Sequence, residues 1–371
     1  MNESLKSRIG IVTFWHSFNY GAVLQCFALR FVIKKLGGEV QVIPLRYGFK
    51  ELSFSRKILH KIALIVRNVF GYRKKRERFL TFFENQLNIE FDDLLSLRDV
   101  AVDNYHKLIV GSDQVWNFEI TSDPIFRLDF GDSAKDSLKY SYAASFGNDS
   151  ISIAQKELFS NSLSDFKAIS VREDSGVSIL NEIGFKAVRV LDPTLLLSSS
   201  DWLDALHLSS SEVSMEKGFV LCYLLTGNQA NRIIIKQAKN YARKEGRKLF
   251  IIGEREYYCL LSTNRIRYVN NLGPEEFVYF LANACMVFTN SFHGTCFSIV
   301  FRKNFCVGID KKSKRNGRII ELLNMLQLQS RICFIGDMEP EYTDVNYNNV
   351  ERILADQQLY SLGFLKKVID E

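Results

Sequence analysis

The sequence predicts an α/β protein built from two Rossmann-like domains that face each other across a cleft. Short apolar runs alternate with amphipathic stretches along the chain, and polar loops follow the apolar runs. Alternating strands and helices favour parallel sheets covered by helices. The chain has 371 residues, more than one ordinary core holds, so we expect two domains. We place them at residues 1–165 and 166–345, with a closing helix over 346–371.

Composition narrows the class of protein. Hydrophobic residues make up 47% and charged residues 24% of the chain, as in ordinary globular proteins. The net charge of +6 suits anionic substrates or a membrane surface, but it is too small to indicate nucleic-acid binding. The seven cysteines form no CxxC pair, so we expect reduced thiols in a cytoplasmic protein. We expect neither a signal peptide nor a transmembrane helix.

The first predicted strand, residues 9–14, leads into a polar loop and then into a helix over 22–36. In open α/β sheets the loop after a strand lies where ligands bind. The loop lacks the GxGxxG pattern of dinucleotide-binding proteins. Its candidate binding residues are His16, Asn19, Tyr20 and Gly21.

Residues 56–78 combine nine Lys and Arg with apolar side chains and a single acid, Glu77. A basic amphipathic helix of this kind can lie on an anionic membrane. The alternative is a helix that packs on the core and exposes a solvated basic face.

Polar residues also follow the predicted strand over 107–110. Ser112, Asp113 and Gln114 stand at its carboxyl end, where Asp113 could accept a proton from a hydroxyl. The alternative is that Ser112 and Asp113 only cap the next turn.

A further strand, residues 168–171, ends at Arg172. A guanidinium at such a turn can grip a phosphate or carboxylate in bidentate fashion. The alternative is a salt bridge with Glu173 or Asp174.

The most informative stretch is a βαβ unit over residues 286–309. We expect a strand over 286–289, a turn over 290–294, a helix over 295–302 and a strand over 305–309. The helix start offers free N–H groups to an anion. The candidates on the turn and at the helix start are Asn290, Ser291, His293, Gly294 and Thr295. His293 is the candidate acid; the alternative is a histidine with no catalytic role.

A group of cations follows this unit. Its members suggest a small polyanionic substrate, although such groups are usually solvated surface. The cations that we select as anion-binding candidates are Lys312, Lys314 and Arg318.

Six motifs occur in the order found in the polysaccharide pyruvyl transferase family, which the chain resembles. The motifs are Asn19-Tyr-Gly-Ala-Val-Leu-Gln25, Gly111-Ser-Asp-Gln-Val-Trp116, Tyr142-Ala-Ala-Ser-Phe-Gly147, Ser170-Val-Arg-Glu173, Leu191-Asp-Pro-Thr194 and Asn290-Ser-Phe-His-Gly294. The resemblance covers most of the chain, from about Ile9 to Leu328. It implies a fold like that of GT-B glycosyltransferases.

The resemblance also implies an activity: transfer of a pyruvyl group from phosphoenolpyruvate to a sugar, usually as a cyclic ketal. Acceptors in the family are often lipid-linked saccharides, such as polyprenyl-diphosphate-linked ones, for capsule, exopolysaccharide or cell-wall synthesis. We therefore expect a cytoplasmic enzyme with peripheral contact to the inner membrane. No cofactor is implied. The first domain would take the acceptor and the second phosphoenolpyruvate.

The resemblance carries over two residues, His293 beside phosphoenolpyruvate and Arg172 as an anion-binding group. Many members have an arginine two positions before this histidine, whereas this chain has Ser291. The missing charge would then come from the cations after residue 310.

The chemistry fits these residue types. A histidine beside a phosphate can protonate C3 of the enol, and a sugar hydroxyl can then attack C2. Asp113 could take the hydroxyl proton, with His16 as the competing base. No metal is required, and no set of metal ligands is visible.

Two other functions remain open at this stage. One is a GT-B-type glycosyltransferase that uses a nucleotide-sugar and binds its diphosphate with the cations. The other is a non-catalytic sugar-binding protein.

Overall fold

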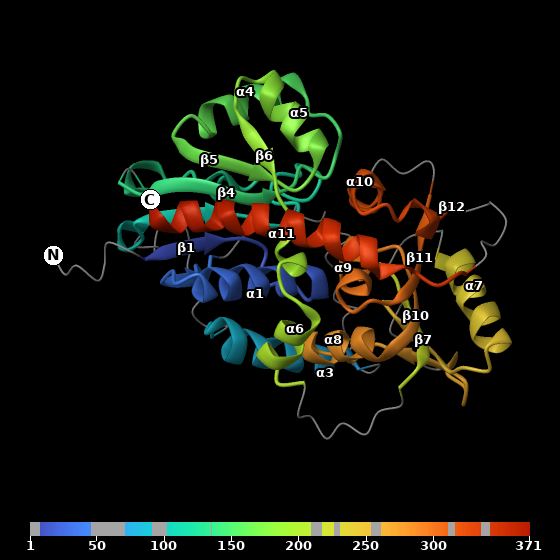
Figure 1. The fold of residues 1–371 in the computed structure, drawn as a ribbon. Helices are drawn as coiled ribbons and strands as arrows, with labels where there is room; N and C mark the ends of the chain where they lie inside the picture. The colour runs from blue at the N-terminus through green and yellow to red at the C-terminus, as the bar shows by residue number, and fades with distance from the viewer. Residues whose placement is uncertain are drawn as a thin grey trace, which may run out of the picture. The chain divides into compact units, whose positions relative to one another are not determined.

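The computed structural model describes residues 8–45, 71–90, 102–134, 136–208, 217–225, 231–253, 261–310, 316–334 and 342–371. The chain forms two compact units. The first comprises Met1–Glu51, Phe83–Leu196 and Leu354–Glu371, and the second comprises Leu52–Phe82 and Leu197–Ile353. Figure 1 shows the elements by their place in the chain.

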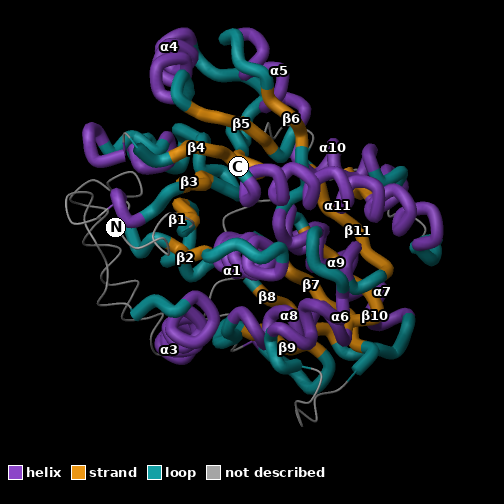
Figure 2. The backbone as a smooth tube through the Cα atoms, turned by 60° about the vertical axis from the view of Figure 1, so that its left-hand side comes forward, coloured by secondary structure: helices purple, strands orange, loops and turns teal. Residues whose placement is uncertain are grey.

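The first unit contains a six-stranded parallel sheet (Figure 2). Its order is β2-β1-β3-β4-β5-β6. Every residue of β1 and β3 is buried, as expected for strands covered on both faces. The strands are β1 (Ile9–Val12), β2 (Val40–Val42), β3 (Lys107–Val110), β4 (Leu138–Ala144), β5 (Phe166–Val171) and β6 (Ala187–Arg189).

Within the described residues, the α-helices of this unit are α1 (Tyr20–Lys35), α4 (Ile153–Ser162), α5 (Asp174–Glu182) and the later part of α11 (Tyr347–Asp370). Short helical turns lie at Phe83–Leu87, Val102–Asn104, Pro124–Arg127, Gly131–Ala134 and Pro193–Leu195. The end of α11 is tied to the sheet, since Lys107 Nζ donates to the Ile369 carbonyl at 2.6 Å. Ser361 Oγ accepts from the Leu191 N–H at 3.0 Å.

The second unit contains another six-stranded parallel sheet, of order β12-β11-β10-β7-β8-β9. Its strands are β7 (Phe219–Tyr223), β8 (Leu249–Ile252), β9 (Ile266–Val269), β10 (Ala284–Thr289), β11 (Asn304–Ile309) and β12 (Ile332–Phe334). Its helices are α3 (Tyr72–Phe82), α6 (Ser199–Ala205), α7 (Asn231–Lys244), α8 (Pro274–Asn283), α9 (Phe292–Val300), α10 (Gly317–Met325) and the turn Gln329–Arg331. The alternation of strands and helices predicted from the sequence is therefore confirmed.

The division of the chain differs from the predicted boundary between residues 165 and 166. Strand β5 pairs with β4, and β6 pairs with β5, so residues 166–196 belong to the first unit. Strand pairing is a tertiary contact that periodicity does not reveal. Helix α3 also departs from the prediction, because it belongs to the second unit despite its early place in the chain.

Helix α3 is the part of the predicted basic helix that lies within the described residues; 56–70 lie outside them. It buries Phe79 and Phe82. Arg78 donates to the Asn271 carbonyl at 2.8 Å and pairs with Glu276 of α8 at 3.0 Å. This part of the segment therefore adopts the core-facing alternative.

The prediction of reduced cysteines is wrong for one pair. Cys306 and Cys333 form a disulfide. They lie on β11 and β12, which are adjacent parallel strands, and are 27 residues apart in the chain. Cys26, Cys222, Cys285 and Cys296 are not disulfide-bonded, and Cys259 lies outside the described residues.

No helix within the described ranges has the length and apolar character needed to cross a lipid bilayer.

Candidate functional site

Each sheet has one topological switch point, where the strand order reverses. In the first sheet the reversal lies between β1 and β3, and in the second it lies between β7 and β10. Ligands of open parallel sheets bind beyond the carboxyl ends of the strands at such points. Most of the described candidate residues lie at one or the other of these points.

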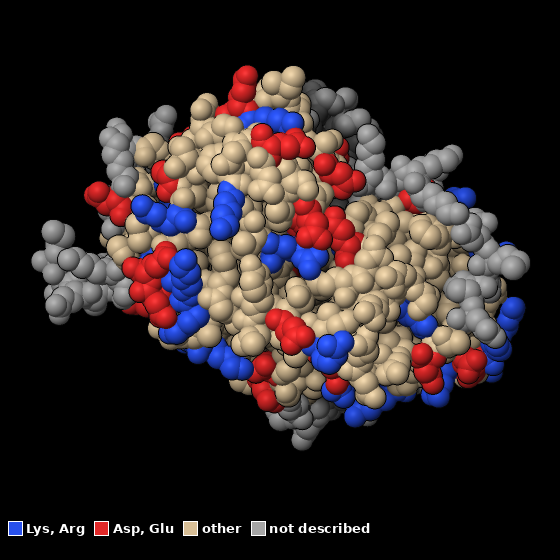
Figure 3. Space-filling model, turned by 45° about the horizontal axis from the view of Figure 1, so that its top comes forward, with Lys and Arg blue, Asp and Glu red and all other residues tan. Residues whose placement is uncertain are grey.

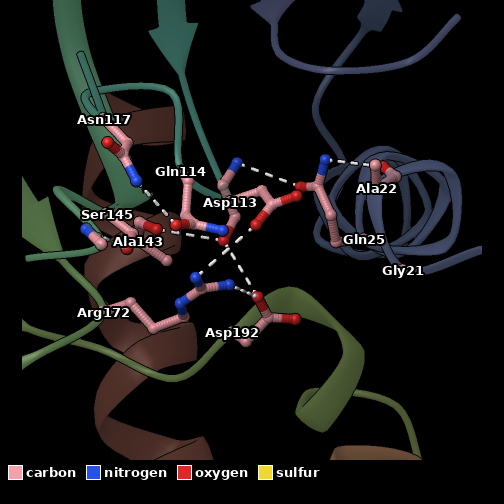
Figure 4. A network of polar contacts seen from close by, with 12 residues as sticks. Gly21, Ala22, Gln25, Asp113, Gln114, Asn117, Ala143, Ser145, Arg172 and Asp192 are labelled. Atoms are coloured by element: carbon pink, nitrogen blue, oxygen red, sulfur yellow. Dashed lines mark hydrogen bonds and ion pairs between the residues drawn. The ribbon is translucent and has the colours of Figure 1, made fainter. Parts of the chain in front are cut away.

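In the first unit a buried arginine is surrounded by carboxylates (Figure 4). Arg172 Nη1 donates to Asp192 Oδ2 at 2.8 Å, and its Nε donates to Glu173 Oε1 at 2.9 Å. Its Nη2 lies 3.6 Å from Asp113 Oδ1, an ion pair longer than a hydrogen bond. We use the term guanidinium cluster for Ser112, Asp113, Arg172, Glu173 and Asp192.

Ser112 and Asp192 connect this cluster to the switch point. The Ser112 hydroxyl lies 3.1 Å from Asp192 Oδ2 and 3.0 Å from the Ala143 carbonyl oxygen. The Ser112 N–H donates to Gln25 Oε1 at 3.1 Å, and Gln25 Nε2 donates to Thr13 Oγ1 at 2.9 Å. Helix α1 and the ends of β1 and β3 thus hold Ser112 in place.

Arg172 is predicted to bind an anion, but its surroundings favour another role. Burial lowers the pKa of this guanidinium, yet Glu173, Asp192 and Asp113 outweigh that effect and raise its pKa above the ordinary value. Its side chain is only 2% exposed. Three carboxylates already surround one cation, so a further anion would meet repulsion there. The salt bridge with Glu173, the alternative to anion binding, is present.

The backbone at Asp113 is unusual. Asp113 has a φ of 68° and Ala143, in the neighbouring strand β4, has a φ of 50°. The pairing of β4 with β5 is irregular between Ser141 and Ala144. Left-handed non-glycine residues and bulges are enriched at functional sites, where they aim side chains. Asp113 is 9% exposed, so the carboxyl predicted to act as a base lies at the border of the buried cluster.

The side chain of Gln114 packs against Gly147 and is hydrogen-bonded to Asn117. Its Oε1 accepts from Asn117 Nδ2 at 2.9 Å. Gly147 has a φ of 69°, and a Cβ there would clash with both of these amide groups. The Gly147 position therefore requires glycine for its conformation and for space.

In the predicted loop before α1, Asn19 caps the helix. Asn19 is the N-cap, and its Oδ1 accepts from the Gly21 N–H at 2.9 Å and the Ala22 N–H at 3.4 Å. Tyr20 is buried, whereas the ring of His16 lies 5.2 Å from that of Trp15. Because Asn19 occupies the first N–H groups of α1, little of this helix start is left for an anion.

In the second unit the predicted turn is shorter than expected. Helix α9 begins at Phe292 with Ser291 as its N-cap, so His293 lies in the first helical turn rather than on a loop. Ser291 Oγ accepts from the Gly294 N–H at 3.3 Å, and Thr295 Oγ1 donates to the Ser291 carbonyl at 2.9 Å. His293 is 7% exposed. The serine cap explains the early start of the helix.

Asn290 ties together the two strands that flank the second switch point. Its Oδ1 accepts from the Leu225 N–H, just beyond β7, at 2.8 Å. Its Nδ2 donates at 2.8 Å to Oδ1 of Asn231, the first residue of α7. Asn231 Nδ2 donates in turn to the Leu225 carbonyl at 3.0 Å. Asn290, predicted as a binding residue, thus fixes the local backbone.

Tyr223 completes this arrangement. It ends β7, and burial raises its pKa to about 12, while a side-chain hydrogen bond with Ser291 opposes the shift. Gly294 lies against it, because a Cβ there would come within 2.9 Å of Tyr223 Cδ1 and clash with Thr289. We use the term imidazole cluster for Tyr223, Thr289, Asn290, Ser291 and His293.

Of the three cations selected above as anion-binding candidates, only Arg318 lies within the described residues. The Arg318 guanidinium lies over the ring of Phe292, 5.7 Å from its centroid, next to His293 in the chain. Lys312 and Lys314 lie outside the described residues. Arg318 therefore brings positive charge to the start of α9, where the helix dipole also favours an anion.

Several residues of the two clusters, and several of their hydrogen-bond partners, are not among the predicted site residues. Asp192 was noticed only within a motif, and Glu173 only as a rival partner of Arg172. Gln25, Tyr223 and Asn231 were not predicted as site residues at all. Tyr223 could have been selected, since it ends an apolar strand just as Asp113 follows one. The others depend on contacts between distant segments, such as the 80 residues between Ser112 and Asp192.

The fold is similar to that of solved nucleotide-sugar enzymes. A UDP-GlcNAc 2-epimerase of Methanocaldococcus jannaschii in complex with UDP-GlcNAc and UDP matches with a TM-score of 0.51 and 10% identity, over 95% of this chain and 99% of that one. The Neisseria meningitidis UDP-GlcNAc 2-epimerase bound to UDP-GlcNAc matches with a TM-score of 0.50 and 12% identity, over 98% and 93%. UGT89C1 of Arabidopsis thaliana, complexed with UDP-L-rhamnose, gives 0.51 and 8%, over 98% and 99%.

These neighbours confirm a GT-B-like α/β fold, and at such low identity they show the fold alone. No curated protein sequence matches the chain. The chain matches the family described as polysaccharide pyruvyl transferase over residues 19–310. All the described members of both clusters fall inside that span. The chain belongs to the polysaccharide pyruvyl transferase family.

Proposed function

We propose that the protein transfers a pyruvyl group from phosphoenolpyruvate to two hydroxyls of a saccharide and forms a cyclic ketal. The observation that carries this proposal is the family match over residues 19–310, which includes both switch-point clusters. The family supports pyruvyl transfer in polysaccharide biosynthesis. The donor, the ketal product and a polyprenyl-diphosphate-linked acceptor are our extensions of that assignment.

The imidazole cluster supplies the donor chemistry in this proposal. The start of α9, Arg318 and the cations Lys312 and Lys314 bind the phosphate and carboxylate groups of phosphoenolpyruvate. His293 gives a proton to C3 of the enol, which converts its methylene to a methyl group and leaves C2 electron-poor. A neutral set of amides and hydroxyls around His293 leaves the positive charge of this region for the anion.

The guanidinium cluster supplies the acceptor chemistry. Asp113 takes the proton of the first sugar hydroxyl as its oxygen bonds to C2, and the C2–O bond to phosphate breaks. The second hydroxyl then closes the ketal and its proton leaves with phosphate, so that one phosphate is released per ketal. Arg172 fixes the carboxylates of this cluster, which is the role that its three partners favour.

The test is a donor comparison with short saccharides and polyprenyl-linked saccharides as acceptors. We expect phosphate release from phosphoenolpyruvate together with a pyruvyl adduct on the sugar by mass spectrometry. The His293→Gln variant should remain folded by circular dichroism and lose about 10²–10⁴-fold in kcat. Turnover of a UDP-sugar but not of phosphoenolpyruvate would overturn the proposal in favour of a glycosyltransferase. An unchanged His293→Gln variant would reject the acid role of this residue.

We further propose a cytoplasmic location at the inner face of the membrane, since a lipid-linked acceptor would be presented there. Cell fractionation tests this: the protein should divide between the cytoplasmic and inner-membrane fractions. Recovery outside the inner membrane, with the secreted material, would contradict it.

A further inference from the structure

Helix α7 carries an unusual row of positive charge. Its buried face packs on the second sheet through Ile234, Ala238 and Ala242. The opposite face presents one row of four cations, Arg232, Lys236, Lys239 and Arg243. Their spacings of four, three and four residues place them on one side of a helix with 3.6 residues per turn. The sequence of α7 contains no acidic residue.

Some cations elsewhere in the described chain form ion pairs with acidic side chains. Lys156, Arg189, Lys366 and Lys367 each pair with a carboxylate. No described carboxylate pairs with any of the four α7 cations. Arg243 contacts the amide of Asn240, and Lys239 lies over the Tyr268 ring at 5.9 Å. Because like charges at i, i+4 oppose helix formation, a row without acids calls for a ligand that brings negative charge.

The shape of the row limits the kind of ligand. Arg232 and Arg243 are separated by about 16 Å along the helix axis, at 1.5 Å per residue. A single phosphate cannot reach cations spread over that length, whereas an extended array of anions can. In Figure 3, Lys and Arg lie along the right-hand edge, with Asp and Glu close to the lower part of that edge; α7 lies on the same side in Figure 1.

Exposed apolar side chains adjoin the row. Ile233 of α7 is 39% exposed and lies between Arg232 and Lys236 in the sequence. Leu225, whose carbonyl accepts from Asn231 at the start of α7, is 42% exposed. A soluble polyanion would leave the leucine and isoleucine side chains exposed to water. The surface of a bilayer can bind cations and bury apolar side chains together. Charge and apolar exposure together favour lipid.

We propose that the exposed face of α7 docks the protein on an anionic lipid bilayer, with the four cations against lipid headgroups and Ile233 and Leu225 at the boundary with the acyl chains. Leu225 adjoins the imidazole cluster, since its N–H donates to Asn290, whereas the four cations belong to neither cluster. The proposal does not depend on the reaction that the enzyme catalyses. A reaction assay and a binding assay can therefore fail independently.

The experiment is co-sedimentation of the full chain with phosphatidylcholine vesicles that contain or lack phosphatidylglycerol. We expect retention only on the anionic vesicles, with release as salt is raised. The variant Arg232→Gln, Lys236→Gln, Lys239→Gln, Arg243→Gln keeps good helix formers. Each cation near an anionic surface contributes about fivefold, so the partition coefficient of this variant should fall roughly 600-fold.

The matched control is Lys156→Gln, Arg189→Gln, Lys366→Gln, Lys367→Gln, which removes the same net charge from the first unit. It should bind vesicles nearly as well as the native chain. Absence of native binding to anionic vesicles, or an equal loss in the control, would overturn the proposal. Binding to soluble dextran sulfate but not to vesicles would also overturn it. If the fourfold variant is unfolded, Lys236→Gln and Arg243→Gln alone should each lower binding about fivefold.

Discussion

The two switch points occupy equivalent places in two similar sheets and carry opposite kinds of polar chemistry. The guanidinium cluster is charged, with three carboxylates around Arg172. The imidazole cluster holds its backbone with neutral groups, the amides of Asn290 and Asn231 and the hydroxyls of Ser291 and Thr295. A buried charge must be paired. A network of neutral groups carries no net charge, so the helix end and a bound ligand set the local electrostatic potential. In the proposed reaction, this difference suits hydroxyl activation in the first unit and anion binding in the second.

The largest expected effect tests whether the charged cluster supplies the base. In the proposed reaction, Asp113→Asn should lower kcat about 10²–10⁴-fold, because the amide cannot accept the hydroxyl proton. Asparagine tolerates the left-handed backbone at this position, so the fold should be retained. The measurement is steady-state phosphate release. His16→Gln is the rival substitution, and a large loss there with an active Asp113→Asn variant would move the base to His16.

Removal of the central cation tests the pairing argument. Arg172→Met leaves three buried carboxylates without their shared guanidinium and should lower the free energy of unfolding by about 3–5 kcal/mol. Urea denaturation measures the loss.

An exposed pair of the same geometry provides the control for that loss. Arg189 Nη1 lies 2.8 Å from Asp174 Oδ2, the distance that separates Arg172 Nη1 from Asp192 Oδ2. Arg189→Met should lower stability by no more than about 1 kcal/mol. Equal losses in the two variants would mean that burial does not set the strength of the Arg172 pairs.

At the imidazole cluster, stability should depend on the volume of the side chains. Gly294→Ala would press a methyl group against Thr289 and Tyr223, and we expect a loss of about 1–3 kcal/mol. Gly363→Ala in α11 is the control, since a Cβ there meets no atom within 4 Å. It should stabilise the helix by about 0.4–1 kcal/mol. Thermal unfolding distinguishes the two, and a stabilised Gly294→Ala variant would refute the packing at this site.

Glu275 of the second unit is a carboxyl whose burial outweighs the effect of the nearby cation Arg78. Burial raises the pKa of Glu275 to about 7 from 4.5, its neighbour Glu276 adds to the shift, and Arg78 opposes it. The folded state therefore binds more protons than the unfolded state between pH 4.5 and 7. Because of this, Glu275 makes stability fall as pH rises through that window.

Glu275→Gln removes this pH dependence. Relative to the native chain, the variant should gain on the order of 1–3 kcal/mol at pH 8 and little at pH 4. Urea denaturation at both values gives the comparison. A variant that gains equally at the two pH values would show that Glu275 does not titrate in this window.

Much of the local structure could be predicted from residue order. Apolar runs such as 9–14 and 286–289 became strands because a buried parallel strand needs apolar residues on both faces. The candidates Asp113, Arg172 and His293 were found because polar residues follow those runs. The start of α9 was misplaced by three residues, since Ser291 acts as an N-cap rather than as part of a longer turn.

The sequence by itself determined the alternation of strands and helices, the family and the candidate residues at the ends of strands. Those features rest on periodicity and local motifs, which are properties of neighbouring residues. Only the tertiary structure decided that β5 and β6 join the first sheet and that Arg172 therefore meets Asp113 and Asp192. It also decided that Tyr223 and Asn231 stand beside Ser291 and Asn290. Strand order and buried ion pairs follow from packing between segments far apart in the chain, and that packing leaves no local trace in the sequence.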